Sequence, residues 1–176
     1  YNTACNENGD TPLILAVKKG HLQLVESLLA VPGTNVNYPN KRGSTALMFA
    51  AVNGHLAVVK RLLAVPKINV NKQNVNGDTA LIIAASIGDS AIVERLLKET
   101  GISVNTQNSN GQTALMWGAQ RGDYLVVQKL LAVPIVDVNK HDMNGDTALM
   151  GAARNGHLHV VEELLAQPDI DVNKYN

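Results

Sequence analysis

Hydrophobic and polar positions along the chain recur with one fixed period. Gly-x-Thr tripeptides begin at residues 9, 43, 77, 111 and 145, and Leu-Leu pairs begin at residues 28, 62, 96, 130 and 164. Both signals, like the Val-Asn pairs between them, are therefore spaced by 34 residues. A fixed period of this length is typical of a repeat array. We expect a single domain, residues 1–176, of five repeats at about 9–42, 43–76, 77–110, 111–144 and 145–176.

The second unit, residues 43–76, shows which elements each repeat contains. Thr45 precedes a run of apolar and small residues, and threonine is a good N-cap, so a first helix is expected to start there. Gly54 stands where a helix commonly ends in a left-handed residue. In residues 56–63 the leucines and valines recur at helical spacing, which predicts a second helix. Each unit is thus predicted to be a helix–turn–helix.

A loop with a tight tip joins each unit to the next. Pro66 cannot continue the second helix, and Asn74 with Gly77 three residues later predicts a type I turn. Because helices this short are marginal in water, each unit must bury its apolar residues against its neighbours. The pattern predicts an all-α solenoid of stacked units. Its paired leucines are expected to be deeply buried at Leu62, Leu63, Leu96, Leu97, Leu130 and Leu131.

Several motifs recur together in this register and resemble the ankyrin repeat. They are Gly-Asp-Thr-Pro-Leu at 9–13, Gly-His-Leu at 20–22, 54–56 and 156–158, and Val-Val-x-x-Leu-Leu at 58–63, 126–131 and 160–165. The resemblance covers five repeats, but the period is 34 rather than the usual value of about 33. Ile or Met also replaces the His of the family's Thr-Pro-Leu-His box in every copy, so apolar packing is expected there. A tetratricopeptide array would share the period, but its Trp-x-x-Leu-Gly pattern is absent.

Composition excludes several classes of function. The 15 basic and 15 acidic residues balance and only 3% of residues are aromatic, which disfavours nucleic acid as a partner. Apolar runs are far shorter than the roughly 20 residues of a membrane-spanning helix, so no membrane insertion is expected. The single Cys5 cannot form an intramolecular disulfide, which fits a reducing, cytoplasmic location, or export into a host cell for a microbial protein. We expect a monomer and, because both ends fall within a repeat loop, a fragment of a longer protein.

The sequence offers no sign of catalysis. P-loop, Rossmann, nucleophile-elbow and His-Glu-x-x-His motifs are absent, so we expect no catalytic residue, no metal and no cofactor. His21, His55 and His157 share one position of the repeat, and Asp89 and Asp123 hold it in the other two copies. Since Asp is a strong N-cap, this position is expected to cap the second helix rather than to bind a metal.

Residues that vary between repeats are the candidates for binding. The resemblance implies that they line a concave groove that binds other proteins. One slot of the repeat is apolar in four copies, which predicts an apolar stripe along the groove: Leu15, Phe49, Ile83 and Trp117. The alternative is that this slot packs one repeat against the next. Trp and Arg are enriched at binding hot spots. The candidate partner-binding residues are Lys41, Arg42, Phe49, Asn53, Ile83, Ile87, Trp117, Gln120, Arg121 and Arg154.

The function expected from these features is that of a module that binds another protein or a peptide. A targeting domain of a longer enzyme or an exported microbial effector is one alternative. Another is an anionic ligand on the second repeat, because residues 41–72 hold six basic residues and no acidic one, whereas residues 141–176 hold six acidic residues. That charge difference predicts a partner oriented along the groove, or an ordinary solvated surface.

Two asparagines are candidates for covalent modification. Leu131 followed by Asp137-Val138-Asn139, and Leu165 followed by Asp171-Val172-Asn173, resemble the ankyrin loops that an asparaginyl hydroxylase modifies in animal cells. The resemblance therefore suggests Asn139 and Asn173. The alternative is that each Asn of the Val-Asn pairs bridges adjacent loops, since polar groups in packed loops need partners.

Overall fold

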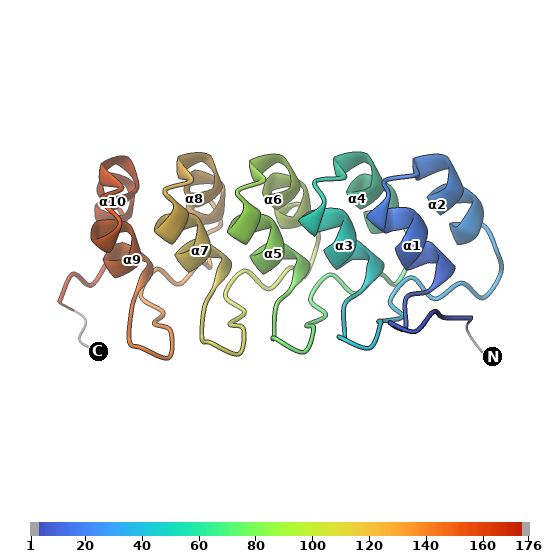
Figure 1. Ribbon diagram of the computed structural model, residues 1–176. Helices are drawn as coiled ribbons and strands as arrows, with labels where there is room; N and C mark the ends of the chain where they lie inside the picture. The colour runs from blue at the N-terminus through green and yellow to red at the C-terminus, as the bar shows by residue number, and fades with distance from the viewer. Residues whose placement is uncertain (1–3, 174–176) are drawn as a thin grey trace.

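The computed structural model describes residues 4–173, and this range contains ten helices in two parallel rows (Figure 1). One row holds α1 (Pro12–Lys18), α3 (Ala46–Val52), α5 (Ala80–Ile87), α7 (Ala114–Arg121) and α9 (Ala148–Arg154). The other holds α2 (Leu22–Leu29), α4 (Leu56–Leu63), α6 (Ser90–Leu97), α8 (Tyr124–Leu131) and α10 (Leu158–Leu165). The loops that join successive repeats project from one side of the helices, and their turns form a row of tips (Figure 1). The all-α solenoid is confirmed, and within residues 4–173 the one bridge between extended residues joins His141 and Thr147.

Each first helix starts at a buried threonine, as its sequence predicts. The hydroxyl of Thr11, Thr45, Thr79, Thr113 or Thr147 accepts a hydrogen bond from the backbone N–H three residues later. That third residue is the Ile or Met of the altered box. Four of these five side chains, at positions 14, 48, 82 and 116, are at most 2% exposed. Apolar packing therefore fills the place where the family usually has a His.

Stacking along the rows makes one continuous core. Small residues of the first helices, such as Ala50 and Ala84, are fully buried, which lets α3 and α5 approach each other closely. The first leucine of each central pair is also fully buried: Leu62, Leu96 and Leu130. Leu63 is buried too, but the prediction was wrong for Leu97 and Leu131, which are half-buried. Consecutive helical residues point about 100° apart, so the second leucine faces the edge of the core.

The tips are tied to one another by backbone hydrogen bonds. In the second tip Gly43 N–H donates to Asn40 O at 2.9 Å, closing the expected turn, and the Asn40 side chain accepts from Arg42 and Ser44. Between tips, the N–H of Lys41 donates to Asn8 O at 3.0 Å. The same bond recurs one period on at each later junction, from residues 75, 109 and 143 to the carbonyls of residues 42, 76 and 110. These bonds fix the spacing of the surface that the tips present.

Loss of a central leucine is expected to destabilise the whole array. Leu96→Ala in the third repeat should lower the free energy of unfolding by about 2–5 kcal/mol, because the side chain is fully buried. Leu164→Ala in the fifth repeat should mainly unfold that repeat, since each repeat contacts only its neighbours. Urea denaturation followed by circular dichroism and by hydrogen exchange separates the two effects. Equal global destabilisation by both changes would contradict nearest-neighbour stacking.

Candidate functional site

A hollow lies where the first two tips meet the first helices. Its volume is about 420 Å³, and it is lined by Glu7, Asn8, Lys18, Asn40, Lys41, Arg42 and Phe49. The tips supply five of these residues, and α1 and α3 supply the other two. Three predicted binding residues, Lys41, Arg42 and Phe49, are therefore brought together here. We call the surface formed by the tips and by α1, α3, α5, α7 and α9 the groove surface.

Lys18 holds one wall of this hollow in place. Its ammonium lies 4.2 Å from the centre of the Phe49 ring and 2.5 Å from Oδ2 of Asp10, which is 1% exposed. Asn40 donates a second hydrogen bond to Asp10, at 2.9 Å. Burial would raise the pKa of the Asp10 carboxyl, but the hydrogen bonds from Lys18 and Asn40 outweigh it and the pKa is lowered. The lysine and its carboxylate thus form a fixed, ionised pair beneath the aromatic ring.

The same pair recurs at the other end of the array. Arg154 donates two hydrogen bonds to the carboxylate of Asp146, at 2.6 and 2.5 Å, and these lower the pKa of Asp146. Arg154 is one of the partner-binding residues predicted from the sequence, whereas Lys18 is not among them. A shared offset of eight residues, from Asp10 to Lys18 and from Asp146 to Arg154, was the signal that could have identified both as structural.

Cations of the groove surface therefore fall into two groups. Lys18, Arg121 and Arg154 are engaged in ion pairs, with Arg121 Nε lying 2.7 Å from Asp123. Lys41 and Arg42 are exposed, and among residues 4–173 neither side chain makes an ion pair. The two tip cations are thus available to a charged group outside the chain.

The apolar stripe combines both functions that the sequence left open. Leu15 is 43% exposed, whereas Phe49, Ile83 and Trp117 are half-buried and pack against the core. The Trp117 indole N–H is buried and has no acceptor among the described residues. In the fifth repeat Gly151 ends the stripe, with Gln120 packed over it. The stripe therefore supports the stack and exposes only part of each side chain.

The remaining predicted residues lie on the same surface with smaller roles. Ile87 is 38% exposed at the end of α5. Asn53 ends α3 and donates its side-chain amide to Phe49 O at 2.8 Å. Gln120 is half-buried, and its backbone carbonyl lies 3.0 Å from Nε2 of His157.

The expectation that His21, His55 and His157, which share one position of the repeat, cap the second helices with their side chains was wrong. None of the three makes a side-chain hydrogen bond to its own helix start. His157 instead reaches back to Gln120 O, and His55 approaches Lys18 O at 3.4 Å, because the long imidazole spans the gap between repeats. Asp89 does cap α6, by accepting from Ile92 N–H at 3.0 Å, but Asp123 pairs with Arg121 and does not cap α8. Within residues 4–173 no three metal-ligating side chains cluster.

A family model described as ankyrin repeats (3 copies) matches residues 1–74, 53–142 and 102–176, which together span the chain. The chain belongs to the ankyrin repeat family. A search of curated proteins gave no match. Ankyrin repeats are general protein–protein interaction modules. None of the described helices is long and apolar enough to cross a membrane.

The basic stretch of this ankyrin array does not form one patch. Lys41 and Arg42 lie on the second tip, Lys60 and Arg61 lie on α4, and Lys67 and Lys72 lie in the loop that follows. The acidic stretch is divided in a similar way, because Asp146 is buried beneath Arg154 whereas Glu162 and Glu163 lie on α10. The charge difference along the sequence is therefore spread over several elements, and of the basic stretch Lys41 and Arg42 are the residues on the tip of the groove surface.

Asparagines of the Val-Asn pairs bridge neighbouring ankyrin loops. Asn139 donates to Asp169 O at 2.6 Å and accepts from Asp171 N–H at 2.8 Å. Asn37, Asn71 and Asn105 make the same two bonds to the following loop. Asn173 lies in the last described loop and is exposed. Modification of Asn139 would therefore require its loop to open first.

The buried carboxylates are expected to make stability depend on acid pH. Asp146 has its pKa lowered from 3.8 in the folded chain, so its ionised form stabilises the fold above about pH 4, and this contribution is lost as the pH falls through the lowered pKa. When the pH is lowered from about 7 to about 3, the melting temperature of Asp146→Asn should therefore fall by less than that of the wild type. Thermal melts by circular dichroism measure this, with Asp169→Asn as an exposed control. The same loss in Asp146→Asn and in the wild type would show that the ion pair adds nothing.

Proposed function

We propose that the chain is a protein-binding module that holds a partner protein or peptide on its groove surface, with the first two repeats as the main contact. The observation that carries this is the hollow between the first two tips, where Lys41 and Arg42 are exposed beside the half-buried ring of Phe49. Arg121 and Arg154 hold intramolecular pairs and are less available to a partner.

The chemistry of this hollow favours a partner segment with an acidic side chain next to an apolar one. A carboxylate can pair with the Arg42 guanidinium in a bidentate manner, and charge-assisted hydrogen bonds of this kind are the strong ones. An adjacent apolar side chain can cover the exposed part of Phe49, in the way that aromatic anchors serve at hot spots. The Lys18 ammonium lies over the Phe49 ring, 4.2 Å from its centre, and holds the ring in position.

We infer no catalytic activity for this module, and an intracellular partner fits it best. The module can equally serve as the targeting part of a longer enzyme or of an exported effector, because a partner-binding surface meets the needs of each. The anionic-ligand alternative receives less support, since the basic residues of the second repeat are divided among the second tip, α4 and the loop after α4. That alternative predicts a steep loss of affinity with salt.

Charge reversal at the second tip tests the proposal. Peptides selected from a random display library against the wild-type chain provide the ligand, and isothermal titration calorimetry measures their binding. The double variant Lys41→Glu, Arg42→Glu should weaken the selected peptides by at least about 2 kcal/mol, or roughly 30-fold in Kd. Its melting temperature should change little, because both side chains are exposed.

A matched control reverses the charge of the exposed Lys60 and the neighbouring Arg61 on α4, outside the groove surface. The double variant Lys60→Glu, Arg61→Glu should bind the same peptides as the wild type does. Selected peptides that bind both double variants equally well, or that are lost in the α4 variant, would place the binding site elsewhere.

The modification of Asn139 and Asn173 is a second, separate proposal, supported by the acid–Val–Asn pattern of their loops. Because Asn139 bridges to the following loop, we expect an asparaginyl hydroxylase to modify the exposed Asn173 faster than Asn139. Peptide mass analysis after incubation with the enzyme would detect one added oxygen atom. An unchanged mass at both residues would remove the proposal.

A further inference from the structure

Each tip ends in a glycine that the fold requires. These glycines all have φ between 73° and 80°, in the left-handed region that favours glycine: Gly9, Gly43, Gly77, Gly111 and Gly145. A Cβ atom on Gly77 would also lie only 2.7 Å from the backbone nitrogen of Ser109 in the next tip. The residue before the glycine is an asparagine in four tips: Asn8, Asn76, Asn110 and Asn144. The second tip has Arg42 there instead.

An asparagine that precedes a glycine is chemically labile in water. The backbone nitrogen of the glycine attacks Cγ of the asparagine side chain, and the lack of a Cβ on glycine leaves this approach unhindered. A bond from the nitrogen to Cγ forms, the bond from Cγ to Nδ2 breaks, and ammonia leaves with the proton of the glycine N–H. Water then opens the resulting succinimide ring, and the product is aspartate or isoaspartate.

The four tip asparagines present their reactive group to water. Their side chains are exposed, and within residues 4–173 no hydrogen bond holds their amide groups. Asn53 and Asn155, at the ends of α3 and α9, also precede a glycine. Each of these two donates its side-chain amide to a helix carbonyl, at 2.8 and 2.9 Å. The tip asparagines are therefore the freer of the two groups.

The turn at each tip slows the attack. The nitrogen that must attack is the one that closes the turn, as Gly77 N–H donates to Asn74 O and Gly111 N–H donates to Asn108 O, both at 2.9 Å. This bond must open before the nitrogen can lose its proton and reach Cγ. One backbone hydrogen bond corresponds to a change of about tenfold in an equilibrium, so the closed turn slows the reaction but does not block it.

We propose that the tips of four repeats are sites of spontaneous deamidation in the folded chain, at a rate set by the opening of each tip: Asn8, Asn76, Asn110 and Asn144. The stacking of the tips requires the glycine, and the exposed asparagine before it makes the tip reactive. Isoaspartate would displace the carbonyl that ties one tip to the next, such as Asn76 O, which accepts from Ser109 N–H at 2.8 Å. Aspartate would keep that carbonyl and add a negative charge to the groove surface.

One of the four sites lies in the hollow that we propose as the binding site. Asn8 lines this hollow together with Lys41 and Arg42. An aspartate at residue 8 would place a carboxylate beside the two cations and oppose an acidic partner segment. This consequence rests on the proposed function, whereas the reaction itself depends only on the tips.

Incubation of the folded chain tests the proposal. The chain is kept for several weeks at mildly alkaline pH, in buffer and in guanidinium chloride, and is then digested in weak acid. Peptide mass analysis measures the fraction of each asparagine that has become aspartate or isoaspartate. The four tip asparagines should convert in the folded chain, and they should convert about tenfold faster or more in denaturant, where no turn holds the glycine N–H.

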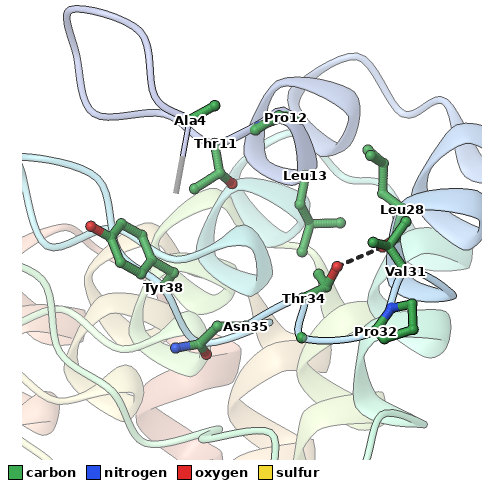
Figure 2. A pocket seen from close by; sticks show the side chains of 11 residues that line it. Ala4, Thr11, Pro12, Leu13, Leu28, Val31, Pro32, Thr34, Asn35 and Tyr38 are labelled. Carbon is green, nitrogen blue, oxygen red and sulfur yellow. Dashed lines mark hydrogen bonds between the residues drawn. The ribbon is translucent and has the colours of Figure 1, made fainter. Parts of the chain in front are cut away.

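Exposed asparagines that precede valine are the internal controls. Asn35, on the wall of the hollow of about 280 Å³ in Figure 2, and Asn69 are each followed by a buried valine, whose branched side chain hinders the attack. They should stay unchanged in the folded chain, and Asn53 and Asn155 should convert more slowly than the tips. Tip asparagines that convert only in denaturant, or controls that convert as fast as the tips, would overturn the proposal.

A variant with one loosened tip tests the role of the turn. The Asn74 side chain accepts from the N–H groups of Asn76 and Asp78, so Asn74→Ala removes both bonds from the third tip. Asn76 should then convert roughly fivefold faster, because two hydrogen bonds no longer hold the turn, while Asn110 in the next tip should keep its wild-type rate. Circular dichroism checks that the fold is kept. An unchanged rate at Asn76 would contradict control by tip opening.

The consequence for binding is measured separately with Asn8→Asp. This variant should weaken the selected peptides roughly three- to fivefold in Kd, as expected for one exposed charge. Asn110→Asp is the matched control on a tip outside the hollow, and it should bind as the wild type does. Equal binding by both variants would remove the consequence for the hollow, and the mass analysis would still decide whether the tips are modified.

Discussion

The stacking of each helix pair on the next is the interaction on which the rest of the molecule depends. Helices of seven or eight residues have too few internal hydrogen bonds to be stable alone, so burial of alanines and leucines between repeats must stabilise them. This requirement fixes the small residues of the first helices and the first leucine of each pair. It also explains why the polar loops are tied together, since a loop that moved would expose the valine beneath it.

Stacking requires many polar side chains to bond within the chain, and the others remain exposed on the surface. Asp10 with Lys18, and Asp146 with Arg154, tie α1 and α9 to the loops before them. The loop asparagines and two of the histidines join one repeat to the next. On the groove surface the tip cations Lys41 and Arg42, beside Phe49, are exposed and make no ion pair among the described residues. The proposed binding site therefore lies where cationic side chains make no ion pair within the described part of the chain.

Most of the architecture could be predicted from the sequence because the period repeats the same local signals five times. The threonine caps, the tip turns and the helix bounds all follow from residues close together in the chain. Contacts between repeats were harder to predict. His157 occupies a capping position, and only the structure shows that its ring reaches Gln120 O instead. The loop after α4 is a further example, because Lys67 adopts a φ of 65°, in the region where the first and third loops use Gly33 and Gly101.

The candidate site was predicted only in part, for a related physical reason. Variation between repeats predicts binding on the groove surface, but a variable residue can contact its own neighbours as well as a partner. Arg154 and Arg121 vary between repeats and still pair within the chain, because an acid lies within reach of each. Lys41 and Arg42 occupy slots of the same kind and share their hollow with Glu7, but among the described residues neither cation makes an ion pair. The paired and the unpaired cations differ in whether a carboxylate lies within ion-pair distance. For Arg154 this carboxylate belongs to Asp146, eight residues earlier in the chain. The pattern of variable positions alone does not reveal such a contact.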